Sequence, residues 1–385
     1  MSIGTRIYAE LKGDRVIWMI VAVLALFSVL AVYSATGTLA YRERGGNTEA
    51  YLLKHGFILG LGLFITYLCY LIHYTRYKQM APWLMVIAIP LLMYTIFLGE
   101  DINNARRWIE LPFVGITFQT SDFAKLALII FVAREITRHK DYIKDFNKAF
   151  LPILVPIVII CGLIAPADLS TALILFTTSV LMLFVGRVDL RYILLLLFLG
   201  VVVFALLIAI GRFFPDVVRV ETWVSRVSDF ITDPDGDYQV RHGKIAIASG
   251  QYFGLGPGNS VMRNYLPAPY SDFIYSIICE EYGLVGGFVI LFLYVLLFVR
   301  TVTLVTKSPK AFGAMVAIGI SLNLVIQALA NMAVSVNLVP VTGLTLPMVS
   351  MGGTSVLFTC ISFGILLSVS KYIEQLSAQQ AQEEQ

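Results

Sequence analysis

Charged residues are scarce in this chain of 385 residues: Asp, Glu, Lys and Arg together make up 14%, against about 25% in an average soluble domain. The 28 basic and 25 acidic residues leave a formal charge of only +3. The basic residues are scattered and form no tract, whereas nucleic-acid-binding proteins carry a basic patch or stripe. We therefore expect no nucleic acid among the partners.

Cysteine and histidine are also rare, with four of each. The cysteines lie singly inside apolar runs, without Cys-x-x-Cys or Cys/His spacing, at Cys69, Cys161, Cys279 and Cys360. This pattern indicates neither a disulfide framework nor a zinc site. The small-residue cleavage pattern of a signal peptide is missing as well, so Arg15–Ala35 is expected to remain as an uncleaved membrane anchor.

Apolar residues, in contrast, make up 58% of the chain. About 20 apolar residues cross a bilayer as a helix, and ten runs approach or exceed that length. They are Arg15–Ala35, Tyr51–Ile72, Pro82–Leu98, Ser121–Ile136, Leu151–Ala165, Thr171–Val185, Tyr192–Ile210, Phe273–Val299, Ala311–Val334 and Thr354–Val369. The fold class predicted is an all-α polytopic membrane bundle of ten helices.

Lysine and arginine are unevenly divided between the segments that join these runs. One alternating set is rich in them: Arg6, Lys12, Arg15, Arg76, Lys78, Arg134, Arg138, Lys140, Lys144, Lys148, Arg187, Arg191, Arg300, Lys307, Lys310 and Lys371. The other short segments hold only Arg42, Arg44, Arg106 and Arg107. Because basic short loops stay in the cytoplasm, both termini are predicted to be cytoplasmic.

The expected domain organisation is simple. Residues 1–374 form a single integral membrane domain, with a large extracytoplasmic loop at about 211–271 between the seventh and eighth helices. Four glycines in Ile245–Gly258 suggest a loop segment that packs against the membrane domain. The Gln-rich residues 375–385 are expected to form a disordered cytoplasmic tail.

Ionisable side chains inside spans are costly and call for an explanation. Asp122 and Lys125 are three apart and can pair on one helix face, as a structural ion pair or as part of an anion site. Adjacent guanidiniums at Arg106 and Arg107, next to Trp108, can hold a pyrophosphate. The alternative for them is contact with lipid headgroups at the membrane surface.

Amides and hydroxyls mark two further segments near the C-terminus. Asn323, Gln327 and Asn331 form one polar stripe at i,i+4 spacing, which favours hydrogen bonds between helices and leaves a substrate cavity as the alternative. The uncharged segment 340–355 is rich in Gly, Pro and hydroxyl residues. Its composition is typical of a re-entrant turn that lines a cavity.

Asp272 provides the strongest single signal for chemistry. It stands in Tyr265-Leu-Pro-Ala-Pro-Tyr-Ser-Asp272-Phe-Ile-Tyr275, where the long loop reaches the eighth span. That position suits a catalytic carboxylate at the mouth of the membrane domain. It also suits a helix N-cap, which is a common role for Asp.

Taken together, these motifs resemble the SEDS family (shape, elongation, division and sporulation). The resemblance extends over most of the chain in fixed order: Ala105-Arg-Arg-Trp-Ile109, Gln119-Thr-Ser-Asp-Phe-Ala-Lys125, Asp168-Leu-Ser-Thr-Ala172, Tyr238-Gln239, Gly254-Leu-Gly-Pro-Gly-Asn-Ser260, Tyr265-Leu-Pro267, Ser271-Asp-Phe-Ile274, Glu280-Glu-Tyr-Gly283, Pro340-Val-Thr-Gly343 and Leu346-Pro-Met-Val-Ser-Met-Gly-Gly-Thr-Ser355. The residues in these motifs are more similar to those of the division branch, FtsW, than to those of the elongation branch, RodA.

The resemblance implies an inverting peptidoglycan glycosyltransferase that polymerises lipid II, an undecaprenyl-pyrophosphoryl disaccharide-pentapeptide, during septal wall synthesis. It implies a place in the bacterial inner membrane beside a class B penicillin-binding protein and other divisome proteins. The family's essential aspartate corresponds to Asp272, which we predict to be the catalytic base. The substrate-binding candidates are Arg106, Arg107, Trp108, Gln119, Ser121, Asp122, Lys125, Gln239, Asn259, Ser260, Ser350 and Thr354.

Some residues depart from the family pattern. The family reads Leu-Pro-Glu before its aspartate motif, but here Ala268 and Pro269 follow Pro267. This substitution argues against a mechanism with two carboxylates. The sequence contains no metal-ligand cluster, so the cofactor expected is none, with a divalent cation (Mg or Mn) as the alternative. A lipid II flippase and a scaffold that only recruits the transpeptidase are the rival functions.

Overall fold

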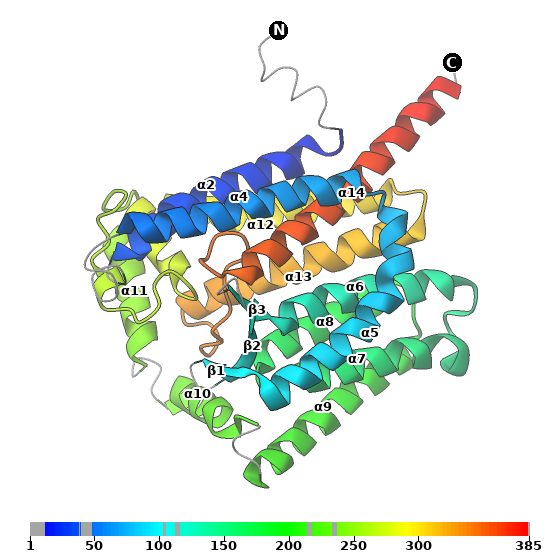
Figure 1. Ribbon diagram of the computed structural model, residues 1–385, viewed down its shortest axis with the longest axis horizontal. Coiled ribbons are helices and arrows are strands. Elements are labelled where there is room, and N and C mark those ends of the chain that lie inside the picture. Colours follow the sequence, from blue (N-terminus) through cyan, green and yellow to red (C-terminus); the bar gives the residue numbers. More distant parts are fainter. Residues whose placement is uncertain are drawn as a thin grey trace.

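The computed structural model describes residues 12–37, 39, 48–102, 105–111, 116–213, 218–232 and 237–383. Long helices lie roughly side by side and make up most of the molecule (Figure 1). They are α2 (Arg15–Ala35), α4 (Thr48–Leu71), α5 (Tyr74–Leu98), α6 (Thr120–Arg138), α7 (Leu151–Ile164), α8 (Leu169–Val185), α9 (Leu190–Phe213), α12 (Ile274–Thr306), α13 (Ala311–Ser335) and α14 (Thr354–Glu383).

Each of the ten predicted segments coincides with one of these helices, although several helices run longer than predicted. Within the described residues, eight helices are long and apolar enough to cross a membrane. The exceptions are α8, which has 17 residues, and α6, whose 19 residues include several charges. The α7 span reaches the required length together with the π-helical turn before it, as Phe146–Ile164. The helical membrane-protein class is therefore confirmed, while length and composition alone do not establish α6 and α8 as crossings.

The predicted tail, residues 375–385, begins inside α14. The structure continues α14 as a helix through Glu383, and residues 384–385 lie outside the described part. The physical reason is local, because Ala, Gln and Glu are good helix formers. A polar segment rich in them extends a helix already nucleated inside the bundle.

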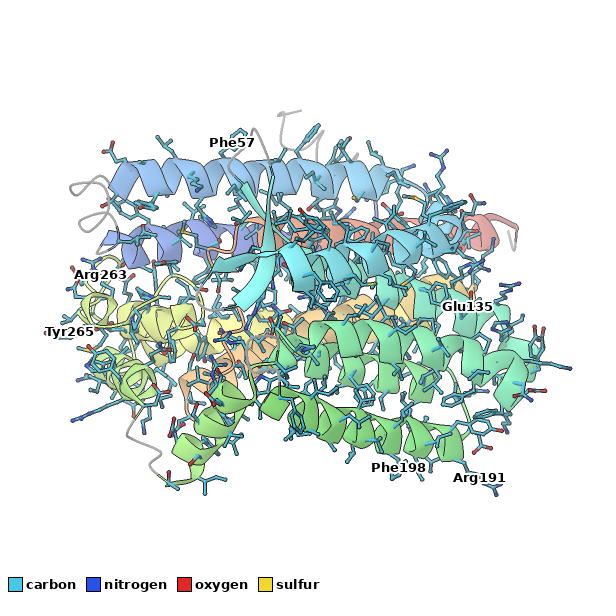
Figure 2. The ribbon with its side chains drawn as sticks, turned by 60° about the horizontal axis from the view of Figure 1, so that its bottom comes forward. Phe57, Glu135, Arg191, Phe198, Arg263 and Tyr265 are labelled. Atoms are coloured by element: carbon cyan, nitrogen blue, oxygen red, sulfur yellow. The ribbon has the colours of Figure 1, made fainter. Side chains whose placement is uncertain are left out.

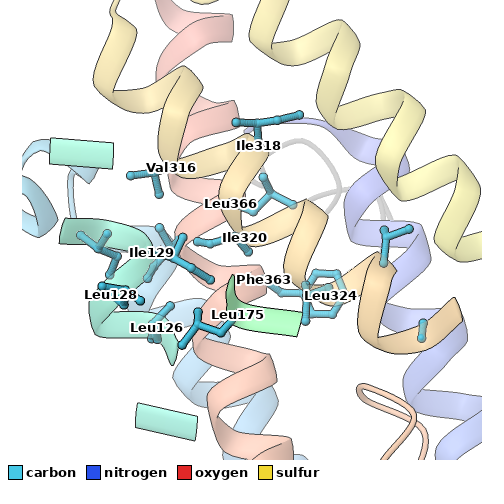
Figure 3. Packing of buried hydrophobic residues seen from close by; sticks show 14 of the residues in the cluster. Leu126, Leu128, Ile129, Leu175, Val316, Ile318, Ile320, Leu324, Phe363 and Leu366 are labelled. Carbon is cyan, nitrogen blue, oxygen red and sulfur yellow. The ribbon is translucent and has the colours of Figure 1, made fainter. Parts of the chain in front are cut away.

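The core is built around α13, which packs against α6, α8, α12 and α14. Buried apolar side chains from these helices interdigitate (Figure 3). They include Leu126, Leu128 and Ile129 of α6, Leu175 of α8, Ile320 and Leu324 of α13, and Phe363 and Leu366 of α14. This rigid centre carries the polar residues described below.

The two ends of the bundle differ in structure. Glu135 and Arg191 lie at one end, while Arg263 and Tyr265 lie at the other (Figure 2). At the first end, η1 (Lys140–Tyr142) and η2 (Phe146–Phe150) lie between α6 and α7. The second end carries the sheet, the long loop and the segment between α13 and α14.

A three-stranded antiparallel sheet connects α5 to α6, in the order β1-β2-β3. The strands are β1 (Glu100–Ile102), β2 (Ala105–Leu111) and β3 (Ile116–Gln119). Trp108 pairs with Gln119, so β2 lies beside the start of α6. This sheet was not predicted, although two β-prone runs on either side of the sequence Pro-Phe-Val-Gly are a recognisable hairpin signal.

The long loop is largely structured. It contains α10 (Val220–Thr232), α11 (Tyr238–Gly250) and η3 (Met262–Asn264). The predicted packing of Ile245–Gly258 on the membrane domain is confirmed, because the loop backbone crosses α12 at its kink. Gly254 and Gly283, with φ of 82° and 67°, meet there, and a Cβ at Gly250 would lie 1.9 Å from the Cys279 carbonyl oxygen.

Candidate active site

A polar cavity of about 390 Å³ opens where the sheet, α10 and the segment between α13 and α14 meet the outer ends of α6, α8 and α12. Four cationic and three carboxylate side chains line it: Arg107, Lys125, Arg219, Arg226, Asp122, Asp168 and Asp272. These residues come from five separate segments of the chain. The structure thus brings most of the predicted charged residues into one compartment.

Asp272 is partly buried in this cavity and its main chain is firmly held. Its carbonyl oxygen accepts a hydrogen bond from the Asn331 amide at 2.7 Å, and the preceding Ser271 carbonyl accepts one from the Ser350 hydroxyl at 2.6 Å. Phe273, not Asp272, occupies the N-cap position of α12. The interpretation of Asp272 as a helix cap is therefore wrong.

Burial raises the pKa of the Asp272 carboxyl from its ordinary value to about 6. The backbone N–H groups of Asp272 and Phe273 and the Arg226 guanidinium oppose this shift, because each stabilises the ionised form. A carboxylate with a pKa near 6 is still ionised at neutral pH, and it is a stronger base than an ordinary Asp. Its environment suits proton abstraction.

Arg107 of β2 is fixed by residues between α7 and α8. Its guanidinium forms an ion pair with Asp168 at 3.0 Å and donates to the Ala167 carbonyl at 2.8 Å. Asp168 also caps α8 by accepting from the Thr171 N–H at 3.1 Å. The sequence analysis placed Asp168 in a motif but did not predict that it would orient Arg107.

The predicted pairing of Asp122 with Lys125 on α6 is confirmed, with 2.7 Å between Nζ and Oδ1. Lys125 also donates to the Gln327 side-chain oxygen at 3.4 Å, and the Gln327 amide donates to the Thr345 carbonyl at 3.0 Å. The polar stripe of α13 therefore serves both roles left open by the sequence. It joins helices, and through Gln327 it lines the cavity.

Sequence reasoning missed Arg219 and Arg226 as site residues. Both belong to the long loop and reach the cavity from α10 or the residue just before it. Burial lowers the pKa of Arg226, and nearby Arg107 lowers it further, while Asp168, Asp272 and Asp237 raise it. Only the fold of the loop over the cavity reveals these contacts, since basic residues in a loop carry no distance information.

Several other predicted residues shape the cavity. Trp108 and Gln119 line it directly. Ser121 accepts from the Gln119 amide at 3.0 Å. The Thr354 hydroxyl accepts from the Gln119 N–H at 3.2 Å and joins β3 to the start of α14. Ser350 supports the Asp272 segment and is buried, so its role in this structure is to position the carboxylate.

The structure does not bring Gln239, Asn259 and Ser260 to the cavity. Gln239 lies at the start of α11, and Asn259 is exposed in the glycine-rich segment. Ser260 is buried against Glu280 on another side of α12. The side chain of Arg106 lies outside the described residues.

An apolar groove continues from the polar cavity toward the middle of the bundle. A second cavity of about 590 Å³ shares Arg107, Asp168, Arg219, Arg226 and Thr342 with the first. A third, of about 300 Å³ between α7, α8 and α9, shares Leu169, Leu173 and Phe204 with the second. Charged and apolar surfaces therefore adjoin in one continuous depression.

Comparison with known proteins agrees with this architecture. The model of the FtsW/RodA/SpoVE cell cycle protein family matches residues 14–375. A probable peptidoglycan glycosyltransferase FtsW of Trichlorobacter lovleyi is 32% identical over 366 residues, covering 93% of each chain. Stage V sporulation protein E of Bacillus subtilis is 30% identical, covering 93% of this chain and 97% of its own.

Solved structures share the fold. A chain from a peptidoglycan synthase complex has a TM-score of 0.71 at 24% identity and covers 94% of this chain and 98% of its own. RodA of Thermus thermophilus has a TM-score of 0.67 at 24% identity with the same coverage. From the family match and the relatives together, the chain belongs to the SEDS family of FtsW, RodA and SpoVE cell cycle proteins.

Proposed function

We propose that this protein is a peptidoglycan glycosyltransferase that polymerises lipid II during septal wall synthesis. The observation that carries this proposal is Asp272, a carboxylate with a raised pKa in a cavity rich in cationic side chains. The names of its curated relatives support the same activity. The preference for division over elongation rests on the relatives named FtsW.

In the proposed reaction, Asp272 accepts the proton of the acceptor sugar 4-hydroxyl. The freed oxygen attacks the anomeric carbon of the donor, and the bond from that carbon to the pyrophosphate breaks in the same displacement. The configuration inverts from α to β, and the leaving undecaprenyl pyrophosphate keeps the electron pair. A base near the attacking hydroxyl and positive charge near the leaving group are both required.

Arg226 is our first candidate for binding the leaving pyrophosphate. Arg107 forms an ion pair with Asp168, and Lys125 forms one with Asp122. Each pair therefore carries little net charge. Arg226 lies close enough to influence Asp272 electrostatically, yet α10 can present it to a substrate. Guanidinium groups bind phosphate oxygens in a bidentate manner, which suits this role.

The apolar groove supports the choice of a lipid-linked substrate. A polyprenyl chain placed along α8 and α9 would bury its hydrocarbon against Leu169, Leu173 and Phe204 while its pyrophosphate reaches the arginines. Soluble sugar nucleotides would leave this surface unused. We therefore assign the polar cavity to the sugar pyrophosphate and the groove to the lipid.

The proposal includes the bacterial inner membrane as the location, with both termini cytoplasmic, because the basic short loops share one end of the bundle. A class B penicillin-binding protein is the proposed crosslinking partner, alongside other divisome proteins. Among the described residues, no three Asp, Glu, His or Cys side chains converge as a metal site. Chelator added to the polymerisation assay tests whether a Mg or Mn ion bound with the substrate phosphates takes part.

The decisive assay follows glycan strands made from labelled lipid II by purified protein, alone and with its transpeptidase. Wild type should form polymer, and Asp272→Asn should form none while unfolding at the wild-type temperature. Equal polymer from both would exclude Asp272 as the base. If neither forms polymer but wild type moves lipid II across vesicles, the flippase function replaces the transferase.

A further inference from the structure

At the end of the bundle opposite the polar cavity, four basic residues converge from three helices. Arg76 and Lys78 lie in the first turns of α5, Lys310 directly precedes α13, and Lys371 lies in the second half of α14; Figure 1 shows these three helices. We call these four residues the basic cluster. The proposed polymerase reaction uses none of them, since they are a whole bundle length from Asp272.

Aromatic rings hold the cluster together. Lys310 Nζ lies 5.5 Å from the centroid of the Tyr372 ring, and Lys371 Nζ lies 4.4 Å from that of Tyr70. Lys78 Nζ lies 5.9 Å from the Phe312 ring. An aromatic face attracts a cation without neutralising its charge. The lysines are therefore oriented while their positive charge stays available.

These cations differ from other basic residues at the same end. Arg300 forms an ion pair with Asp14 at 2.6 Å, and Arg134 forms one with Glu135 at 2.7 Å. Within the part of the chain that the structure describes, no member of the basic cluster forms an ion pair with a carboxylate. Like charges that are not paired directly with carboxylates repel one another, so the cluster favours an anionic ligand.

His73, at the turn between α4 and α5, lies among these cations. Its ring stacks on Tyr74 with centroids 5.0 Å apart and meets the edge of Tyr372 at 4.9 Å. Burial lowers the pKa of His73, and the charges of Lys310, Arg76 and Lys371 lower it further. Three cations from three helices therefore act on one imidazole, which places them around a common point.

The surface next to the cluster indicates what kind of anion fits. Arg76 continues along α5 into Met80, Trp83 and Ile87, at the spacing of one helix face. Met80 is 46% exposed, Trp83 71% and Ile87 50%, so this apolar stripe faces the surroundings of the bundle. A soluble phosphate would use only the cations, whereas a phospholipid would use both surfaces. Basic clusters next to membrane helices are a common way to bind anionic headgroups.

We propose that Arg76, Lys78, Lys310 and Lys371 bind the phosphate of an anionic phospholipid headgroup, with its acyl chains along the exposed stripe of α5. The shared chemistry is a phosphate oxyanion, and phosphatidylglycerol is the probe we choose. Such a lipid would tie together the starts of α5 and α13 and the second half of α14. The site is independent of the proposed polymerase activity.

Native mass spectrometry of the full-length protein, purified in detergent, tests this site. Phosphatidylglycerol and phosphatidylcholine are added in turn, and retained lipid is measured. Each lysine near an anionic lipid contributes about five-fold in affinity, so the double variant Lys310→Gln/Lys371→Gln should bind phosphatidylglycerol about 30-fold more weakly. Lys144→Gln/Lys148→Gln, exposed at the same end, is the control with the same charge change and should bind like wild type.

Three results would overturn the proposal: equal loss in both double variants, no loss in either, or equal retention of the two lipids by wild type. In a further experiment, glycerol phosphate and inorganic phosphate are added as competitors of phosphatidylglycerol. Competition by them at the lipid's own concentration would assign the cluster to a soluble phosphate instead. A 15N-labelled His73 signal that titrates at higher pH with phosphatidylglycerol bound would locate the headgroup at the cluster.

Discussion

Two carboxylates eight residues apart, the partly buried Asp272 and the fully buried Glu280, have opposite surroundings. Glu280 is fully buried in α12 and accepts hydrogen bonds from the Ser260 hydroxyl and from the N–H groups of Val261 at 2.9 Å and Met262 at 3.2 Å. Asp272 has its main chain fixed by Asn331, while its side chain lines a cavity shared with Arg226. The oxygens of Glu280 are occupied by hydrogen-bond donors of the protein itself, whereas the carboxylate of Asp272 faces a cavity with space for a substrate.

The difference teaches how to separate structural from reactive acids in a membrane protein. A carboxylate whose oxygens receive several backbone donors fixes a loop, here the turn at η3, and has no capacity left for a substrate. The Asp272 carboxylate has only the N–H groups of Asp272 and Phe273 as backbone donors, it lines a cavity that has room for a substrate, and burial raises its basicity. Sequence alone gives both residues the same chemical character.

The matched amide variants Asp272→Asn and Glu280→Gln should show the largest contrast. Asp272→Asn should lower polymerisation about 10³-fold, because it removes the base, while thermal unfolding stays at the wild-type temperature. Glu280→Gln should lower the free energy of unfolding by about 1–3 kcal/mol, since one buried donor loses its partner. Loss of activity in a fully stable Glu280→Gln protein would break the comparison.

Arg226→Gln should lower kcat about 10²-fold if the guanidinium stabilises the leaving pyrophosphate. Because Arg226 holds the pKa of Asp272 down, its removal should also move the acid limb of the rate profile to higher pH. Steady-state polymerisation across a pH series measures both effects. Arg241→Gln, exposed in α11 of the same loop, serves as the control and should change neither.

The wild-type rate itself should depend on pH through Asp272. Its pKa of about 6 means that the carboxylate becomes protonated as the pH falls through 6. Polymerisation should therefore be nearly constant at neutral pH and fall about tenfold per unit below pH 6. If the polymerisation rate instead began to fall near pH 4, at the ordinary pKa of Asp, burial would not be raising the pKa of Asp272.

The smallest expected effect concerns the support of Asp272. Asn331→Ala removes the hydrogen bonds from one amide to the carbonyls of Asp272 and Leu344, both at 2.7 Å. It should cost about 1–2 kcal/mol of stability and reduce kcat several-fold with little change in KM. Asn323→Ala on the same stripe should have a weaker effect in both assays, because the Asn323 amide oxygen, like that of Asn331, has no hydrogen-bond partner among the described residues, whereas the Asn331 NH2 group makes two hydrogen bonds.

Much of the fold followed from apolar run length, since each long run became a helix. The Asp122–Lys125 pair was predictable because both residues lie on one helix turn. The sheet was missed because its strands are short and lie in a loop. The pairing of Arg107 with Asp168 was missed because these residues are separated by 61 positions. They come together only because α6 and α7, which lie between them in sequence, pack side by side.

The sequence by itself determined the membrane class, the helices, the family and the candidate base, because apolar length, helical period and ordered motifs are local properties of the chain. Tertiary structure decided the rest. It placed α10 over the cavity with Arg226, excluded Ser260 from the site and assigned it to Glu280, and joined the polar cavity to an apolar groove. These outcomes depend on distances across the bundle, which packing sets and no local pattern encodes.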